Sequence, residues 1–436
     1  MAASPDTAVL PPGPRGPRLL TVGRFLLQPE TFIPECRERY GALFTIRLSK
    51  ERTIVVCGDP AVAKEVFQGD PAVLHAGAGN VVLRPLLGAR SVLTLDGPEH
   101  LRQRRLMLPP FHGERMRRYG DRMREIAARH VSQWPVGEPF AVHRSMQAIT
   151  LEVILRVVFG VEDRARLAQC AAPLRALLDS TTQPWRLLGL QFTSSAGARP
   201  RTPWGRVKRL LAPCDRMIYE EIAARRAAAE PGDDILSLLL EARDEQGQPL
   251  TDRELRDELM TLLLAGHETT ATALAWTVER VTRHPQVLAQ LQDGGAPEGY
   301  LDAVITETLR LRPVVPAVVR KLQAPQTFGG WELPAGVNIA PNIWLIHRDP
   351  LLYPEPEAFR PERWLGRRPG TYEWIPFGGG IRRCLGASFA LYEMRIVLEE
   401  ILARTRLQPT SDPAEAVVRR FVTFAPAGGG RVAVAV

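Results

Sequence analysis

Cysteine is scarce in this sequence, with five residues in 436 and no Cys-x-x-Cys pair. This pattern predicts reduced thiols and therefore a cytoplasmic protein. Apolar runs of about 18 residues are also missing, which excludes a membrane-spanning helix. The first twenty residues lack the charged-then-apolar order of a signal peptide. We therefore expect a soluble protein that stays in the cytoplasm.

Acidic residues are fewer than basic ones: the sequence has 48 Asp and Glu and 56 Lys and Arg, which gives a net charge of +8. Nucleic-acid binding would call for a recognisable fold or interleaved aromatic and basic residues, and neither is present. A basic face for a small acidic redox protein is the preferred interpretation. The alternative is that most of these arginines lie on a plain solvated surface.

The chain also lacks internal repeats and domain linkers, although 436 residues exceed the usual size of a single core. Its apolar content of 45% and charged content of 24% are typical of a globular protein. Strand-like runs at 44–48 and 53–57 predict a hairpin, as do residues 327–339. Residues 421–426 and 431–436 predict a final hairpin. The rest is largely helical in pattern, so we expect one mostly helical body with small β-sheets.

Cys384 lies in the stretch Phe377-Gly-Gly-Gly-Ile-Arg-Arg-Cys-Leu-Gly386. The glycines let the backbone approach a ligand closely, and a helical pattern follows at 387–402. At such a helix start, unpaired amides and the helix dipole favour a thiolate, and Arg382 can neutralise an anion beside it. A thiolate at the base of a glycine-rich loop suits a metal ion whose other ligands the protein need not supply, and haem iron fits that description. An axial thiolate on haem iron favours O–O cleavage. The alternative is a buried structural cysteine.

The same ten residues resemble the haem-binding signature of the cytochrome P450 superfamily, Phe-x-x-Gly-x-Arg-x-Cys-x-Gly, at every fixed position. The resemblance implies a soluble bacterial-type member, with one P450 domain over residues 1–436. It implies a mainly α fold with small β-sheets, and a haem between the long central helix and the cysteine-loop helix. Residues 1–20 would be a proline-rich leader. Only ten residues precede its prolines, too few for the anchor helix of membrane-bound relatives, so no anchor is expected.

The resemblance also assigns haem contacts. Cys384 would be the axial ligand of the iron, and Phe377, Arg382 and Gly386 would lie against the haem. His100 and Arg104 are four residues apart on one predicted helix face, which alone indicates only a solvated pair. In its place along the chain this His-x-x-x-Arg pattern resembles the family's contact to a haem propionate. Arg320 resembles the second propionate contact.

Residues 251–283 form the longest helical pattern. Thr251-x-x-Glu254 is a capping box, and Pro285 follows the far end. About thirty residues at roughly 1.5 Å each span about 45–50 Å. Residues 259–275 are apolar on nearly all sides, which predicts a buried helix.

Polar groups interrupt this apolar helix at Ala265-Gly-His-Glu-Thr-Thr270. Burying them costs about 1–3 kcal/mol each unless they are partnered, which indicates a functional cavity. The stretch resembles the family's oxygen-activation motif. By that resemblance Glu268 and Thr269 are catalytic and carry protons, while Ala265 and Gly266 leave room for the cofactor and oxygen.

Two further resemblances concern the residues that support the cysteine loop and the residues that line the substrate pocket. Glu307, Arg310 and Arg363 resemble the buried Glu–Arg–Arg network that fixes the loop leading to the cysteine, with Trp364 where phenylalanine is commoner. Residues 70–95 have the composition of a mobile loop that can cover an apolar ligand. By resemblance, the substrate pocket includes Val92, Leu93, Leu95, Val315, Ala317, Phe421 and Val422. A lid carrying Trp185, Leu187, Leu188 and Phe192 would form its roof, or else a loop packed on the surface.

Together these patterns predict an oxidoreductase: a haem-thiolate monooxygenase, binding haem b and using O₂ to hydroxylate an apolar fatty acid, terpenoid, steroid or related molecule. No flavin or nicotinamide fingerprint is present, so electrons must come from a ferredoxin or flavodoxin with its reductase. We expect a monomer whose partner docks near the cysteine side, through Arg102, Arg105, Arg117 or Arg383. A peroxide-dependent or hydroperoxide-rearranging enzyme is one alternative, and a non-catalytic haem sensor is another.

Overall fold

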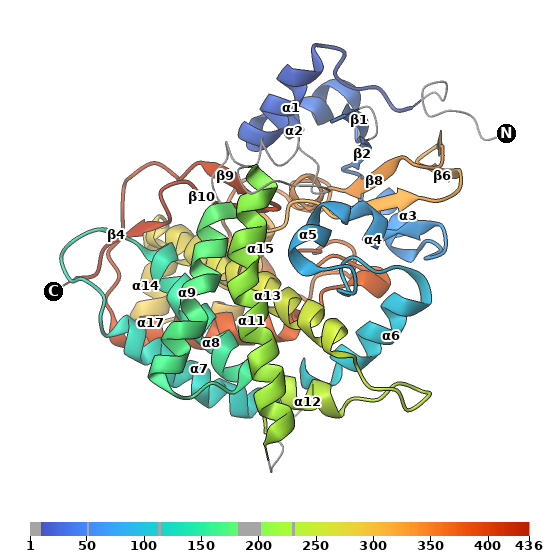
Figure 1. Cartoon of the computed structure of the whole chain (residues 1–436). Helices are drawn as coiled ribbons and strands as arrows, with labels where there is room; N and C mark the ends of the chain where they lie inside the picture. The colour runs from blue at the N-terminus through green and yellow to red at the C-terminus, as the bar shows by residue number, and fades with distance from the viewer. Residues whose placement is uncertain (1–9, 50–51, 112–114, 182–201, 229–231, 436) are drawn as a thin grey trace. The chain divides into compact units, whose positions relative to one another are not determined.

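The computed structural model describes residues 10–49, 52–111, 115–181, 202–228 and 232–435. Helices dominate and the β-sheets are small, as the sequence predicted (Figure 1). The chain divides into two compact units, each assembled from separate stretches of sequence. Unit 1 comprises residues 1–81, 283–384 and 411–428, and unit 2 comprises residues 82–282, 385–410 and 429–436. That both belong to one domain over residues 1–436 stays a prediction.

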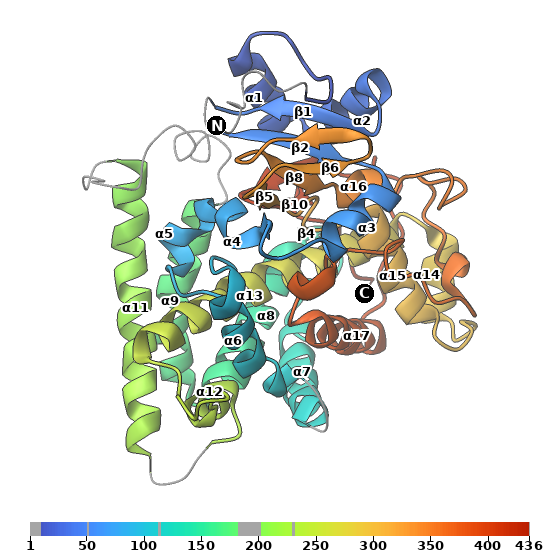
Figure 2. The same ribbon diagram turned by 90° about the vertical axis from the view of Figure 1, so that its right-hand side faces the viewer.

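Unit 1 contains a five-stranded sheet of β1 (Leu43–Arg47), β2 (Thr53–Cys57), β8 (Asn338–Pro341), β5 (Arg320–Leu322) and β3 (Leu74–His75), in that order. β1 and β2 form the predicted antiparallel hairpin, with β-branched residues along both strands. β2 pairs with β8 in parallel, whereas β5 pairs antiparallel with both β8 and β3. α1 (Arg18–Leu27) and α2 (Pro29–Tyr40) lie against β1 (Figure 2).

Beneath this sheet, α3 (Pro60–Gln68) packs Val62, Ala63, Val66 and Phe67 into the core of unit 1. Asp59 begins the helix, because its carboxylate accepts hydrogen bonds from the Ala61 and Val62 amides. The other elements of unit 1 are α4 (Ala76–Gly79), α14 (Pro285–Gln292), α15 (Tyr300–Leu311), β6 (Gln326–Phe328), β7 (Trp331–Leu333), α16 (Ile343–Ile346), η3 (Pro361–Trp364), η4 (Gly380–Arg382), β9 (Val417–Arg420) and β10 (Thr423–Pro426).

Unit 2 is a helical bundle around α13 (Asp252–Thr282), which packs against α8 (Val142–Phe159), α11 (Pro203–Ala227) and α17 (Ala387–Arg404). α7 (Arg115–Val131) packs against α17 and α8, and α9 (Arg164–Thr181) packs against α8 and α11 (Figure 2). The remaining elements are η1 (Val81–Leu83, at the boundary with unit 1), α5 (Arg84–Leu87), α6 (Gly97–Met107), η2 (Pro109–Phe111), β4 (Phe140–Ala141), α12 (Ile235–Glu241) and β11 (Arg431–Val432).

The predicted capping box starts α13. The Thr251 amide donates to Glu254 Oε2 at 2.8 Å, and the Glu254 amide donates to Thr251 Oγ1 at 3.3 Å. Over its 31 residues, α13 is buried on most sides, as expected for a helix that is apolar all round. No helix in the described ranges combines the length and apolar character needed to cross a bilayer.

The predicted final hairpin is wrong. Residues 421–426 do not pair with 431–436, because β10 pairs with β9 and β11 pairs with β4. Gly429 and Gly430 both adopt a positive φ, 77° and 68°, and so redirect the chain between these strands. The expected roof residues Trp185, Leu187, Leu188 and Phe192 lie outside the described residues.

Candidate active site

Cys384 differs from the other four cysteines, because it is exposed and they are buried. Burial raises the pKa of the Cys36 and Cys170 thiols to about 11 and that of the Cys57 and Cys214 thiols to about 12. Those four cysteines therefore stay protonated as thiols. They are buried structural cysteines, the alternative that was considered for Cys384, whereas Cys384 itself is exposed. Cys384 is the one cysteine whose side chain is exposed, and its role as a thiolate ligand stays a prediction.

Glycines shape the loop that carries Cys384. Gly378 and Gly380 have φ values of 68° and 64°, which favour glycine. A Cβ at Gly380 would overlap the backbone carbonyl of Phe67, so the loop lies directly on the end of α3. The Cys384 amide donates to the Phe377 carbonyl at 3.0 Å and closes the loop. The helix after the cysteine, α17, begins only at Ala387.

Phe67 is a residue that the sequence analysis missed. Its ring lies under the buried Arg320, whose guanidinium carbon is 6.0 Å from the ring centroid. Its backbone lies under Gly380, and its ring stacks on Tyr372 at 6.0 Å. Arg320, the predicted propionate contact, and the cysteine loop therefore share one support within unit 1. Only the packing of α3 reveals this, since residue 67 is distant from both in sequence.

Glu307 is the centre of the predicted network and is fully buried, as is Arg310. Arg310 donates to both carboxylate oxygens of Glu307, at 2.8 and 2.9 Å, and Arg363 Nε donates at 3.0 Å. The Arg360 amide donates at 2.9 Å. The indole N–H of Trp364 adds a fifth bond at 2.8 Å, so this departure from the family's usual phenylalanine supplies another donor to the carboxylate.

His347 joins this network to the cysteine loop. Its Nδ1 lies 3.1 Å from the Arg310 carbonyl, and its Nε2 accepts a hydrogen bond of 2.9 Å from the Ile375 amide, two residues before Phe377. Burial, and secondarily the Arg310 charge, lowers the pKa of His347 to about 3. No local sequence pattern indicated this role of His347.

We expect acid to destabilise the protein through its buried imidazoles. Burial lowers the pKa values of His347 and His267 to about 3, so the unfolded state binds more protons between about pH 6.5 and 3. The contribution of these histidines to the free energy of unfolding is complete above pH 6.5. It falls with decreasing pH by about 1.4 kcal/mol per pH unit for each histidine. Urea unfolding at pH 7, 6 and 5 measures this slope, and His347→Gln should reduce it by one histidine's share. Identical slopes in both proteins would contradict the prediction.

In unit 2, α6 carries His100 and Arg104 on one face, as the spacing predicted. His100 is buried and Arg104 is half-buried. Asp96 is the N-cap residue, but its side chain makes no capping bond. The contact of this pair with a propionate stays a prediction.

The middle of α13 has one open face. Leu262 and Thr269 are half-buried and Ala265 is exposed, although nearly all residues from Leu255 to Thr282 are buried. Their spacing of three and four residues places them on one side of the helix. Thr269 Oγ1 donates to the Ala265 carbonyl at 2.5 Å, which fixes the hydroxyl there. The exposed side of α13 therefore carries the small side chain of Ala265 and the hydroxyl of Thr269, as the motif predicted.

Gly266 has a packing role. A Cβ at this position would come within 2.7 Å of Ile154 Cδ1 on α8, so the glycine lets α8 and α13 approach closely. The approach of a cofactor to Gly266 stays a prediction.

Glu268 is buried and points to α8. Gln147 Nε2 donates to Glu268 Oε2 at 2.7 Å, and His143 Nε2 lies 3.6 Å from Oε1. His143 Nε2 also lies 3.1 Å from Thr272 Oγ1. His143 and Gln147 are four residues apart on α8, as are Glu268 and Thr272 on α13. One face of each helix therefore carries two of these four side chains. The sequence could not identify His143 and Gln147 as neighbours of Glu268, because no local pattern connects residues so far apart in the chain.

The loop with Val92, Leu93 and Leu95 is hydrogen-bonded to α13. The Val92 amide donates to Glu258 Oε1 at 2.8 Å, and the Arg90 amide donates to Asp257 Oδ2 at 2.9 Å. Thr261 and Ser91 join their hydroxyls at 2.7 Å. Val92 and Leu95 are buried and Leu93 is half-buried. The partners of these residues lie some 170 residues away in the chain. That residues 70–95 form a mobile loop stays a prediction.

The other predicted pocket residues lie in unit 1. Val315 and Ala317 are half-buried, between α15 and β5. Phe421 and Val422 form the two-residue turn between β9 and β10. Phe421 has a φ of 56°, which is unusual for an aromatic residue and marks a conformation imposed by its surroundings. Such positions cluster at functional sites, and the contact of these four residues with substrate stays a prediction.

Comparison with known proteins agrees with this geometry. A family model described as "Cytochrome P450" matches residues 11–294 and 299–425. Cytochrome P450 135B1 of Mycobacterium tuberculosis is 44% identical over 435 residues, covering 98% of this chain and 91% of the relative. Cytochrome P450 135A1 of the same species is 39% identical over 439 residues, covering 99% and 96%.

Two solved structures share the architecture. Cyanobacterial CYP120A1 with bound retinoic acid superposes with a TM-score of 0.85 at 26% identity, covering 98% of this chain and 99% of that one. The haem domain of cytochrome P450DA gives 0.83 at 26% identity, covering 98% and 97%. The mainly α architecture with small sheets is therefore the P450 fold. With the family model matching nearly the whole chain, this protein belongs to the cytochrome P450 family of haem-thiolate monooxygenases.

Proposed function

We propose that this protein inserts one oxygen atom from O₂ into an apolar small molecule, such as a fatty acid, terpenoid or steroid, with Cys384 as the thiolate ligand of haem b. The observation that carries the proposal is the contrast between exposed Cys384 in its glycine loop and the four buried thiols. Bound haem supplies the oxygen-activating chemistry, and the protein supplies ligation, orientation and protons.

The chain has groups that fit a haem. Cys384 provides the soft anionic donor that iron takes in this family. A haem has two carboxylates, and guanidinium groups bind carboxylates in a matching planar geometry. By the family resemblance, the donors to these carboxylates would be Arg320, Arg382, His100 and Arg104. The open α13 face at Ala265 offers little side-chain bulk against a flat ligand.

Protons are proposed to move through Thr269 and Glu268. The Thr269 hydroxyl donates to the Ala265 carbonyl, which leaves its oxygen lone pairs to accept from a second group. Glu268 accepts a hydrogen bond from Gln147 and lies beside His143. Retention of both the acid and the alcohol supports O₂ rather than peroxide as the oxidant. Product from peroxide, with none from O₂ and a redox chain, would instead support the alternative enzyme.

Thr269→Ala is expected to keep haem binding but to lower oxidation with O₂ by about 100-fold or more, because general acid catalysis contributes about 10²–10⁴-fold. Electrons should then leave as hydrogen peroxide, which is measured against product formed per O₂ consumed. Thr277→Ala is the matched control, since Thr277 makes the same backbone bond to Ala273 at 2.8 Å but is fully buried. Coupled oxidation by Thr269→Ala would contradict the proposed role.

A ferredoxin or flavodoxin with its reductase is proposed to supply electrons, with Arg383 as a docking residue. Arg383 is exposed, whereas Arg102 is ion-paired with Asp244 and Glu254, and Arg105 with Glu245. Of the four arginines expected to dock a partner, Arg117 and Arg383 thus remain the better candidates.

Arg383→Glu is expected to slow first-electron transfer about tenfold at low salt and to weaken its salt dependence, because complementary charge mainly accelerates encounter. Stopped-flow reduction in the presence of carbon monoxide measures the rate. Arg47→Glu, on an exposed arginine of β1, controls for net charge. Equal rates and salt slopes in all three proteins would exclude docking at Arg383.

A further inference from the structure

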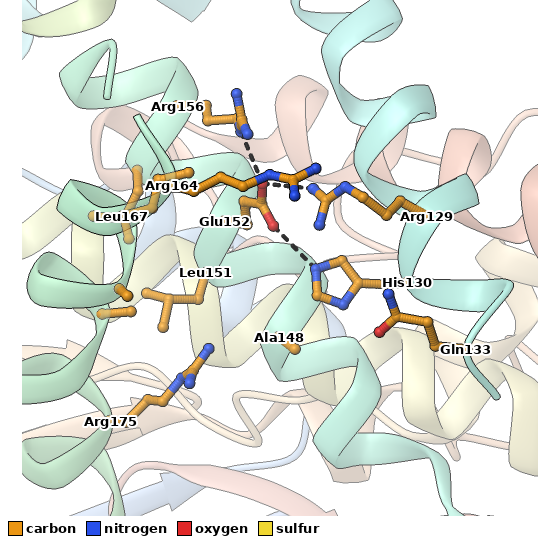
Figure 3. Close-up of a pocket in the computed structure, with 13 residues that line it drawn as sticks. Arg129, His130, Gln133, Ala148, Leu151, Glu152, Arg156, Arg164, Leu167 and Arg175 are labelled. Atoms are coloured by element: carbon orange, nitrogen blue, oxygen red, sulfur yellow. Dashed lines mark hydrogen bonds and ion pairs between the residues drawn. The ribbon is translucent and has the colours of Figure 1, made fainter. Parts of the chain in front are cut away.

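A cavity of about 360 Å³ lies among α7, α8 and α9 in unit 2 (Figure 3). This volume is within the range of small-molecule sites, about 300–1,000 Å³. The cavity uses the side of α8 that carries Leu151, Glu152 and Leu155. The side of α8 with His143 and Gln147 bonds to α13 instead. The cavity is therefore separate from the proposed proton-transfer residues.

Positive charge dominates the lining. Four arginines and one histidine face a single carboxylate, namely Arg129, Arg156, Arg164, Arg175, His130 and Glu152. The Glu152 carboxylate already has three partners, because Arg129 donates at 2.6 Å, Arg156 donates at 2.8 Å and His130 Nε2 lies at 3.0 Å. Burial alone would raise the pKa of Glu152, but these hydrogen bonds lower it to about 2. Glu152 thus stays ionised and occupied by its three partners.

Arg164 and Arg175 are left as surplus cations. Neither makes an ion pair or hydrogen bond with another described residue, and both side chains are exposed. In Figure 3, Arg164 extends over Glu152, Arg175 lies at the other end of the view, and Leu151 lies between them. The Arg175 charge also contributes, after burial, to the lowered pKa of His267. An anion in the cavity would meet guanidinium groups that no carboxylate of the described chain neutralises.

The rest of the cavity wall is hydrocarbon. Its apolar members are Ala148, Leu151 and Leu155 of α8 and Leu167, Ala168 and Ala171 of α9. Their spacing of three and four residues makes a continuous apolar strip on each helix. Covering such a strip contributes roughly 25 cal/mol per Å² of apolar surface removed from water. Cationic ends and an apolar wall together favour a ligand with an anionic head and a hydrocarbon tail.

We propose that this cavity binds a small amphiphilic carboxylate. The carboxylate accepts paired N–H bonds from Arg164 or Arg175, a geometry that a guanidinium matches. The tail lies on the alanine and leucine strip between α8 and α9. The site is distinct from the haem site and does not depend on the oxidation chemistry proposed above.

Decanoate is the probe, titrated calorimetrically into the full-length, haem-loaded protein. An azole that ligates the iron keeps the haem site filled, so only binding elsewhere is measured. Binding at one site is expected, at least tenfold weaker for decanol and absent for decyltrimethylammonium. The double variant Arg164→Glu/Arg175→Glu should weaken decanoate binding at least tenfold. Arg253→Glu, an exposed arginine at the start of α13, should leave binding unchanged.

Ala168→Trp separates shape from charge, because it fills the cavity and keeps every cation. It should also abolish decanoate binding, while thermal unfolding and haem content verify that each variant is folded. Decanoate binding that survives the double arginine variant or Ala168→Trp would overturn the proposal. So would equal binding of decanol, or binding that disappears when the azole fills the haem site.

Discussion

Serine in place of Cys384 is expected to abolish turnover with O₂ and to remove the long-wavelength absorption band of the reduced, carbon monoxide-bound protein. The reason is that an alcohol side chain does not supply the electron-rich thiolate that favours O–O cleavage. Haem content should fall as well, because the axial bond is lost. Difference spectra of reduced protein with and without carbon monoxide measure the band directly.

Cys36→Ala is the matched control for this experiment. Cys36 is a buried thiol of α2 with a raised pKa, so its replacement should leave the band and turnover intact. The proposal fails if Cys384→Ser keeps either the band or turnover. It also fails if Cys36→Ala, with Cys384 unchanged, loses the band while remaining folded.

Glu307→Ala is expected to lower the free energy of unfolding by about 3–5 kcal/mol, the usual cost of removing one partner from a buried ion pair. Arg310 is fully buried and would keep its charge without the carboxylate. The Arg363 guanidinium and the Trp364 indole would lose their acceptor as well. Against a total stability of about 5–15 kcal/mol, this loss removes a large part of the folding free energy. Urea unfolding measures it.

Two variants sharpen this experiment. Glu298→Ala removes an exposed carboxylate and should change stability by less than about 0.5 kcal/mol. Glu307→Leu combined with Arg310→Met removes both charges, and should be less destabilising than Glu307→Ala because the fully buried Arg310 charge is removed together with its partner. A change below about 1 kcal/mol for Glu307→Ala would show that the network contributes little.

Local patterns predicted much of this protein. The capping box of Thr251 and Glu254 works within one helical turn, so its sequence signature was sufficient. The β1–β2 hairpin is likewise local. The predicted final hairpin was wrong because Gly429 and Gly430 redirect the chain after β10, so that β10 pairs with β9 and β11 pairs with β4.

Contacts between distant segments were decided by packing. The sequence placed Trp364 near the network, but only the structure shows its indole donating to Glu307. No sequence pattern singled out His347, yet it links Arg310 to the cysteine loop. Carboxylates of α13 accept hydrogen bonds from the Arg90 and Val92 amides, which no local pattern indicated. Each case depends on partners far apart in the chain, whose meeting no local pattern encodes.

By itself, the sequence determined the family, the haem-thiolate signature around Cys384 and the acid–alcohol pair of α13, because these are short motifs whose chemistry resides in neighbouring residues. The tertiary structure alone decided which thiols are buried, which groups hold Glu268 and Glu307, and where a cationic cavity opens among α7, α8 and α9. The physical reason is that burial and partnership are properties of space rather than of sequence order. They set the pKa values, the packing and the open surfaces on which the function rests.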